Sequence, residues 1–254
     1  MKLTKSQRRP VLALISLAPL ALLLAAACSG DDAPEEPRPA DGARIERITT
    51  ADGLALDARL FVPPAGFPER AGQLIVLLHM YPADQSAWWE TARDLATSGV
   101  TALTLDFRGF GASEGDKSGS EIQRDVVAAL DWARTRGYED LVVAGASMGG
   151  TAAIVAASEV DGVDGVLALS APSSFRGLDA DRALPGLGVP LVAMAAEGDV
   201  SAMDSLKRFE ERCSPGGCQI TRLPGRAHGT DLLETPEAAR VRRALDALME
   251  QAWG

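Results

Sequence analysis

The sequence LVVAGASMGGTAAIVAA, residues Leu141–Ala157, contains the features that decide the fold of this protein. It joins an apolar run typical of a buried strand, Leu141–Gly145, to a helix of small residues predicted over Thr151–Ser158. Between them lies a G-x-S-x-G pattern centred on Ser147. So tight a turn strains the serine backbone and requires small residues two positions before and after it. It would present the hydroxyl at a helix start, where negative charge is favoured; a glycine-rich turn that only allows close packing is the alternative.

Strands and helices alternate on both sides of this stretch. Unbroken apolar runs predict buried strands, and amphipathic segments with capping residues or a terminal glycine predict helices. The predicted strands are Arg44–Thr50, Leu54–Val62, Gln73–His79, Val100–Asp106, Leu141–Gly145, Val163–Ser170, Pro190–Ala196 and Gln219–Leu223. The predicted helices are Trp88–Thr97, Ile122–Arg136, Thr151–Ser158, Met203–Arg212 and Pro236–Gln251.

This order of elements predicts an α/β fold, a mostly parallel, open, twisted sheet with helices on both faces. The first two strands are joined by Ala51–Gly53, and an Asp-Gly pair between alternating runs indicates an antiparallel hairpin. A closed barrel also alternates strands and helices, but the early hairpin and the number of strands favour an open sheet.

The motifs together resemble those of the α/β-hydrolases, and the resemblance covers essentially all of residues 44–254. Asp106–Ser113 (DFRGFGAS) resembles the D-x-R-G-x-G-x-S segment of that superfamily, and Leu78–Pro82 (LHMYP) follows the first central strand. The short inserts are most similar to dienelactone-hydrolase-like proteins and small esterases, although Ser147 differs from the Cys nucleophile of dienelactone hydrolases proper. The resemblance implies the order Ser, acid, His along the chain, with Ser147 as nucleophile and no metal or organic cofactor.

A serine nucleophile needs a base, because its hydroxyl is barely ionised at neutral pH. The chain has two histidines, His79 and His228. His228 follows the last predicted strand, where the catalytic base of the superfamily lies. His79 precedes Ser147 and resembles the histidine of the oxyanion loop. We therefore expect His228 to be the base; the alternative is an incidental surface histidine.

The acid of the triad is expected after the strand before the last. Asp199 follows a glycine there, as in the superfamily, and would hold the imidazole tautomer and stabilise the imidazolium. Glu197 lies two residues earlier on the same loop and is the competing carboxylate.

The oxyanion hole needs two backbone N–H donors aimed at the developing negative charge. The resemblance implies that one is the N–H of Met148, directly after the nucleophile, and that the other comes from the loop after His79. Pro82 has no N–H, which leaves Met80 or Tyr81. We favour Tyr81 by its position. Met80 stands where the superfamily usually has glycine.

The segment 171–189 separates two predicted strands at the point where many hydrolases insert a helical cap. It is short and rich in Pro and Gly, which predicts a loop and no cap domain. We therefore expect an open pocket. Trp88, Phe110, Phe175 and Leu178 either line that pocket or pack in the core.

Residues 1–27 have the composition of a secretory signal. They begin with four Lys or Arg residues and no acid, and an apolar run follows that is short for a membrane span. The run ends at Cys28, and this junction resembles a bacterial lipoprotein signal in which Cys28 becomes the lipidated first residue. An ordinary signal peptide is the alternative, and Arg8-Arg9 leaves a twin-arginine export route open.

Residues 28–43 are acidic and rich in proline, which predicts a flexible tether ahead of a hydrolase domain over residues 44–254. Removal of residues 1–27 would change the formal net charge from −10 to −14. We expect an exported protein, lipid-anchored to the bacterial cell envelope on its periplasmic or outer face.

Cys213 and Cys218 flank a Ser-Pro-Gly-Gly turn, and this spacing in an exported protein suggests a local disulfide, with two free thiols as the alternative. A zinc site is disfavoured because a second pair of ligands is missing from the pattern.

Composition excludes several classes of protein. With 46% hydrophobic and 24% charged residues, the chain is too apolar to be disordered. The formal charge of −10 argues against a nucleic-acid binder, because such proteins use positively charged residues to contact the phosphates. The expected partner is a small-molecule ester, with membrane contact only through the lipid anchor.

The expected activity is hydrolysis of carboxylic esters through an acyl-enzyme, with Ser147, Asp199 and His228 as the triad and Tyr81 and Met148 as oxyanion donors. A peptidase or acyltransferase with the same triad is one alternative. A non-catalytic lipoprotein that keeps the hydrolase scaffold is another.

Overall fold

The computed structural model describes residues 42–254, apart from residues 68, 69, 118 and 215. The predicted signal sequence (1–27), Cys28 and all of the tether except residues 42 and 43 lie outside the described residues. In the part of the chain that is described, no helix is both long enough and apolar enough to span a bilayer.

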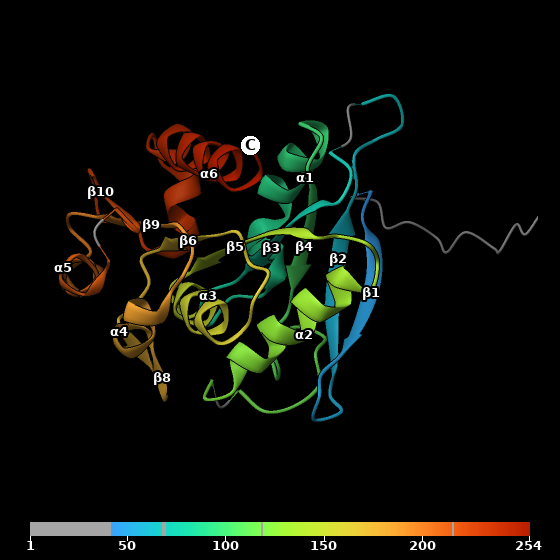
Figure 1. The fold of residues 1–254 in the computed structure, drawn as a ribbon, viewed down its shortest axis with the longest axis horizontal. Coiled ribbons are helices and arrows are strands. Elements are labelled where there is room, and N and C mark those ends of the chain that lie inside the picture. The colour runs from blue at the N-terminus through green and yellow to red at the C-terminus, as the bar shows by residue number, and fades with distance from the viewer. Residues whose placement is uncertain (1–41, 68–69, 118, 215) are drawn as a thin grey trace, which may run out of the picture. The chain divides into compact units, whose positions relative to one another are not determined.

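A mixed sheet is the central element of the described residues. Its strands are β1 (Arg44–Thr49), β2 (Ala55–Phe61), β3 (Gln73–Leu78), β4 (Thr101–Leu105), β5 (Asp140–Ala146), β6 (Gly165–Leu169), β9 (Leu191–Ala196) and β10 (Cys218–Leu223). Across the sheet the order is β1-β2-β4-β3-β5-β6-β9-β10 (Figure 1). β2 pairs antiparallel with β1 and β4, and the other neighbours pair in parallel. The expected open, mostly parallel sheet with an N-terminal antiparallel hairpin is confirmed.

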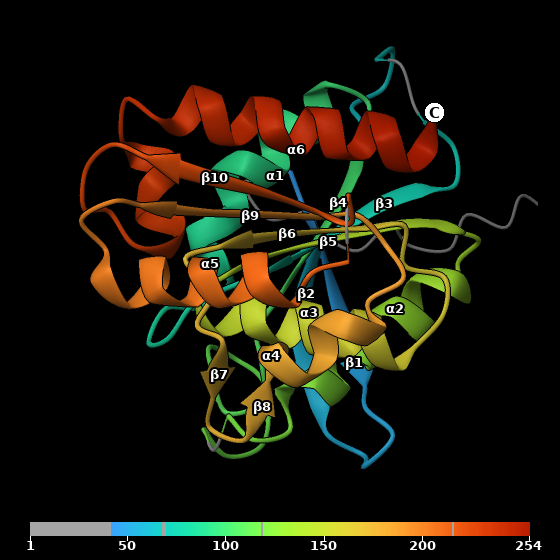
Figure 2. The same cartoon turned by 60° about the vertical axis from the view of Figure 1, so that its left-hand side comes forward.

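Helices cover both faces of this sheet. They are α1 (Trp89–Thr97), α2 (Ile122–Arg134), α3 (Met148–Glu159), α4 (Ala180–Ala183), α5 (Val200–Arg212) and α6 (Ala238–Trp253), with short 3₁₀ turns η1 (Gln85–Trp88), η2 (Leu184–Gly186) and η3 (Gly229–Glu234). Helices α1 and α6 pack on one face and α2, α3 and α5 on the other (Figures 1 and 2). Strands β4, β6 and β9 are buried along their whole length because helices lie on both sides of them.

Helix α3 lies close to the sheet because its residues are small. Its hydrophobic residues and glycines are buried all round, from Met148 to Ala157, so the helix has no polar face. Its first residue is Met148, three residues before the predicted start. Helix α5 likewise begins three residues early, at Val200, because the side chain of Asp199 caps its N-terminus.

The segment 171–189 contains regular secondary structure where a loop was predicted. It forms a small hairpin of β7 (Ser174–Phe175) and β8 (Leu178–Asp179), followed by the single turn of α4 and by η2. Figure 2 shows the hairpin projecting below α4. The prediction of a plain loop was therefore wrong, because a two-residue turn at Arg176-Gly177 pairs the short strands, although the segment is far smaller than a cap domain.

The predicted disulfide between Cys213 and Cys218 is formed, with a Cα–Cα distance of 5.9 Å. It joins the end of α5 to the start of β10.

Candidate active site

Ser147 occupies the turn between β5 and α3. Its φ and ψ angles are 46° and −114°, a conformation that residues other than glycine rarely adopt. The peptide is held on both sides, since Ser147 N donates to Leu169 O at 2.7 Å and Ser147 O accepts from Thr151 N at 3.1 Å. The strained turn predicted by G-x-S-x-G is therefore present, with the serine side chain at the carboxyl end of the sheet.

The glycines that flank Ser147 are required by the close approach of the backbone. A Cβ on Gly145 would lie 2.3 Å from the carbonyl oxygen of Gly149. A Cβ on Gly149 would lie 2.5 Å from Leu78 O and 2.7 Å from His79 O. Both contacts are with main-chain atoms, so no side-chain movement would relieve them.

His228 connects the other two side chains of the predicted triad. Its Nε2 lies 2.8 Å from Ser147 Oγ, and its Nδ1 lies 2.6 Å from Asp199 Oδ2. The Asp199 side chain is 8% exposed and that of His228 is 40% exposed, so the carboxylate is enclosed and the imidazole can be reached from solvent. The three residues come from the ends of β5, β9 and β10. With this geometry, the imidazole can take the serine proton while the carboxylate fixes its tautomer.

Asp199 has a second role that sequence reasoning missed. Its Oδ1 accepts weak hydrogen bonds from Ala202 N and Ser201 Oγ, both at 3.4 Å, and thereby caps α5. The cap was detectable in the sequence as an aspartate directly before a helix. Glu197, the competing carboxylate, is exposed, and its backbone N–H donates to Leu223 O.

The two candidate oxyanion donors come from different elements, the start of α3 and the loop after β3. Met148 is the first residue of α3, where backbone N–H groups have no partner within the helix. Tyr81 follows Met80 in the loop after β3. The Met80 sulfur lies 2.6 Å from the place where a Cβ of Gly229 would be, so this loop packs against the residue that follows His228. The loop after β3 and the loop that carries His228 are therefore in contact.

His79 is fully buried and links two loops. Phe107 N donates to His79 Nε2 at 3.1 Å, which makes Nδ1 the protonated nitrogen, and Nδ1 lies 2.9 Å from Met80 O. Burial lowers the pKa of His79 below its ordinary value. The neutral ring thus fixes the carbonyl of Met80, next to Tyr81, in the loop after β3.

The D-x-R-G-x-G-x-S segment forms a buried polar network. Arg108 is 3% exposed and pairs with Asp125 Oδ1 at 2.7 Å and Asp52 Oδ2 at 2.8 Å. Burial raises the pKa of Asp125, although the Arg108 hydrogen bonds act in the opposite direction. Asp106 accepts from Gln85 N at 2.8 Å. These contacts bind the loop after β4 to its neighbours, so this motif supports the structure around the site.

Three of the four residues considered for the pocket wall are in the core. Trp88, Phe110 and Leu178 are buried, and the indole N–H of Trp88 donates to Leu78 O at 2.9 Å. Of the two alternatives expected for these residues, the structure places all three in the core, and Leu178 also lines a separate groove beside α3 and α4. Phe175 is half-buried.

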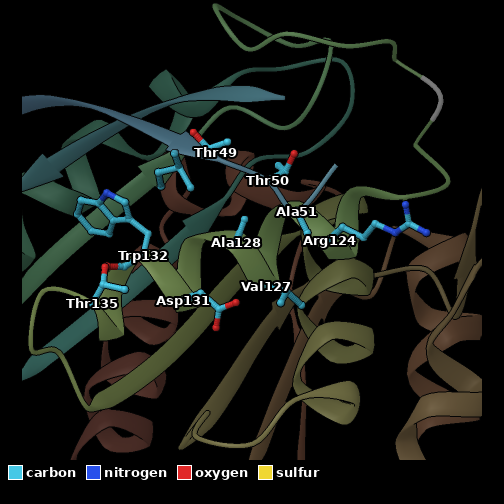
Figure 3. Close-up of a pocket in the computed structure, with 10 residues that line it drawn as sticks. Thr49, Thr50, Ala51, Arg124, Val127, Ala128, Asp131, Trp132 and Thr135 are labelled. Carbon is cyan, nitrogen blue, oxygen red and sulfur yellow. The ribbon is translucent and has the colours of Figure 1, made fainter. Parts of the chain in front are cut away.

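A groove of about 540 Å³ lies elsewhere, between the end of β1 and α2 (Figure 3). Trp132, Val127 and Ala128 contribute to its lining, and no residue of the predicted triad does. In the described part of the chain, no group of three or more His, Cys, Asp or Glu residues is placed to hold a metal ion.

Comparison with known families and sequences finds a peptidase family, an epoxide hydrolase and uncharacterized proteins. Residues 69–187, a little under half of the chain, match the family described as serine aminopeptidase, S33. An uncharacterized protein of Salmonella typhi, YfhR, is 31% identical over 166 residues, which are 60% of this chain and 56% of that protein. Epoxide hydrolase B of Mycobacterium tuberculosis is 30% identical over 141 residues, 53% of this chain and 38% of that enzyme. The matches thus span about half, or less, of the length of these relatives.

Solved structures resemble nearly all of the described residues. An esterase of Pyrococcus furiosus superposes with a TM-score of 0.69 at 19% identity, covering 84% of this chain and 91% of that one. A dienelactone hydrolase of Anabaena variabilis gives a TM-score of 0.65 at 19% identity, covering 82% and 97%. At these identities the likeness shows the fold, and the chain has the α/β-hydrolase fold.

Proposed function

We propose that this protein is a serine hydrolase that cleaves carboxylic esters through an acyl-enzyme. The observation that carries the proposal is the hydrogen-bonded series Ser147–His228–Asp199, with distances of 2.8 Å and 2.6 Å, at a strained turn between a strand and a helix. The fold, which it shares with solved esterases, supports the same activity.

In the proposed reaction, Ser147 Oγ attacks the ester carbonyl as His228 Nε2 takes its proton. The backbone N–H groups of Met148 and Tyr81 donate to the oxyanion. His228 then protonates the departing alkoxide, which leaves an acyl group on Ser147. Water, deprotonated by His228, releases the carboxylic acid and restores the serine, while Asp199 stabilises the imidazolium in both steps.

Replacement of the nucleophile tests this proposal. Ser147→Ala is expected to lower kcat for p-nitrophenyl acetate by about 10⁴-fold or more, because no other group at the site forms the acyl-enzyme. Ser158→Ala, at the other end of α3, is the matched control and should keep wild-type activity. Hydrolysis that survives Ser147→Ala would refute the proposed nucleophile.

A serine peptidase is the second candidate, favoured by the description of the family that matches residues 69–187. Leucine p-nitroanilide and p-nitrophenyl acetate distinguish the two activities. An esterase is expected to cleave the ester faster than the anilide by a ratio well above the ratio of their uncatalysed rates of hydrolysis. Efficient Ser147-dependent cleavage of the anilide would favour the peptidase. Absence of both activities, together with no labelling by a fluorophosphonate, would favour a non-catalytic scaffold.

We further propose that the hydrolase domain is exported and anchored to the cell envelope through a lipidated Cys28. The basic and apolar sequence before Cys28 supports this placement. Cys28→Ser should abolish acylation and move the protein from the membrane fraction to the soluble fraction. Unchanged membrane partition of this variant would contradict the anchor.

A further inference from the structure

The tip of the β7–β8 hairpin carries an arginine in an unfavourable backbone conformation. Arg176 has a φ of 44° and precedes Gly177, whose φ is 97°. Two-residue hairpin turns with positive φ at both positions strongly favour Asn-Gly or Gly-Gly. A long charged side chain at this position is therefore not explained by the turn, and strained residues of this kind are concentrated at functional sites.

Contacts with aromatic rings and with a neighbouring loop hold the Arg176 guanidinium. It lies 4.8 Å from the centre of the Tyr81 ring and 5.4 Å from that of Phe175, and its Nη1 donates to Lys117 O at 2.7 Å. Lys117 Nζ lies 4.8 Å from the centre of the Phe110 ring, and the Phe110 and Tyr81 rings are nearly perpendicular, with their centres 5.9 Å apart. We call these five residues, Tyr81, Phe110, Lys117, Phe175 and Arg176, the cation–aromatic cluster.

The cluster adjoins the candidate active site through Tyr81. Tyr81 follows Met80, whose sulfur packs against Gly229, the residue next to His228. The Tyr81 side chain is on the surface, since the residue is 44% exposed. Two cationic side chains, Arg176 and Lys117, are thus held by aromatic rings beside the loop that contains a proposed oxyanion donor.

This arrangement suits a substrate that carries a negative charge. A guanidinium has five N–H donors in a planar fork that matches a carboxylate, and stacking on aromatic rings reduces its freedom before binding. Lys117, whose carbonyl accepts from Arg176 and whose Nζ lies over Phe110, adds a second positive charge to the cluster.

We propose that Arg176 is a specificity-determining residue that favours esters whose acyl part ends in a carboxylate. The inference rests on the proposed esterase activity and adds the substrate class. The Arg176 guanidinium binds the distal carboxylate, Lys117 adds electrostatic attraction, and the scissile carbonyl lies at Ser147. Neutral esters of the same length lack the charged contact and bind more weakly.

Two p-nitrophenyl esters of matched length test the proposal, the mono-ester of adipic acid and the hexanoate. Arg176→Asn is the main variant, because Asn-Gly preserves the hairpin turn while the charge is lost. We expect the ratio of kcat/KM for adipate over hexanoate to fall roughly tenfold in Arg176→Asn, mainly through KM for adipate. Arg176→Lys should give an intermediate ratio, and Arg182→Asn, which removes a charge from nearby α4, should leave the ratio unchanged.

An unchanged ratio in Arg176→Asn, or an equal fall in Arg182→Asn, would overturn the assignment. A direct measurement separates this outcome from failure of the esterase proposal. Calorimetric titration of the Ser147→Ala variant with monomethyl adipate should show binding that is weakened by adding Arg176→Asn. Equal binding by the two variants would refute the inference, even if the wild type hydrolysed neither ester.

Discussion

Among the described residues, three that are not glycine have a positive φ, namely Ser147, Ser170 and Arg176. Ser147 and Ser170 directly follow β5 and β6, and Arg176 is in the hairpin beside Tyr81. Conformations of this kind cost about 1–3 kcal/mol each and persist where the surroundings enforce them. Their positions thus place backbone strain at the carboxyl edge of the sheet, where the candidate site lies.

The two roles of Asp199 can be separated by one substitution. Asp199→Asn should lower kcat by about 10⁴-fold, because an amide in place of the carboxylate favours the wrong imidazole tautomer. Asparagine is also a good N-cap, so α5 should remain stable. The matched control is Glu197→Gln on the same loop, whose side chain is exposed. A larger loss of activity in Glu197→Gln than in Asp199→Asn, measured with p-nitrophenyl acetate, would identify Glu197 as the acid.

His79 should make stability depend on pH. Because burial lowers its pKa below the ordinary value of 6.5, the unfolded chain binds more protons as pH falls through that value. The stabilisation is therefore complete above about pH 6.5 and decreases below it, with a slope of at most about 1.4 kcal/mol per pH unit.

Urea unfolding between about pH 7.5 and 5.5 measures this dependence. The comparison is made in a His228→Asn background, so that His79 is the one histidine left. Adding His79→Gln should remove the slope in this range. An equal slope in both proteins would show that another group is responsible.

Among the elements, the turn between β5 and α3 packs directly against the end of β3, and this contact positions Ser147. Gly149→Ala would bring a methyl group within 2.5 Å of Leu78 O, an overlap with main chain on a central strand. We expect this variant to lose about 3 kcal/mol or more of unfolding free energy. Gly188→Ala is the control, because nothing lies within 4 Å of its Cβ position. Equal stability of the two variants by urea unfolding would contradict this packing.

The central strands were predictable because long apolar runs buried on both faces have few alternatives. The β7–β8 hairpin was harder to predict from the sequence. Ser174 and Leu178 lie in a short Pro- and Gly-rich segment, and the stacking of Arg176 on Tyr81 joins residues 95 positions apart along the chain. Such contacts depend on how loops meet in space, which a local pattern does not encode. The choice between pocket wall and core for Trp88 was open for the same reason, since its buried hydrogen bond to Leu78 O is a tertiary contact.

At the scale of the whole molecule, the parallel strands bring the triad residues together. Ser147, Asp199 and His228 follow β5, β9 and β10, and the carboxyl ends of parallel strands meet at one edge of the sheet. Their juxtaposition could be predicted from the motif and from the order of residues along the chain, because that order maps onto the strand order. Their catalytic roles stay predictions until activity is measured.

Reaction with a fluorophosphonate, followed by peptide mass spectrometry, tests whether Ser147 is a nucleophile activated by His228. We expect a single stoichiometric adduct on the peptide that contains Ser147, much slower labelling of His228→Ala, and no adduct on Ser147→Ala. A wild-type protein that hydrolyses p-nitrophenyl acetate but is not labelled by the probe, or is labelled at another residue, would contradict the role of Ser147.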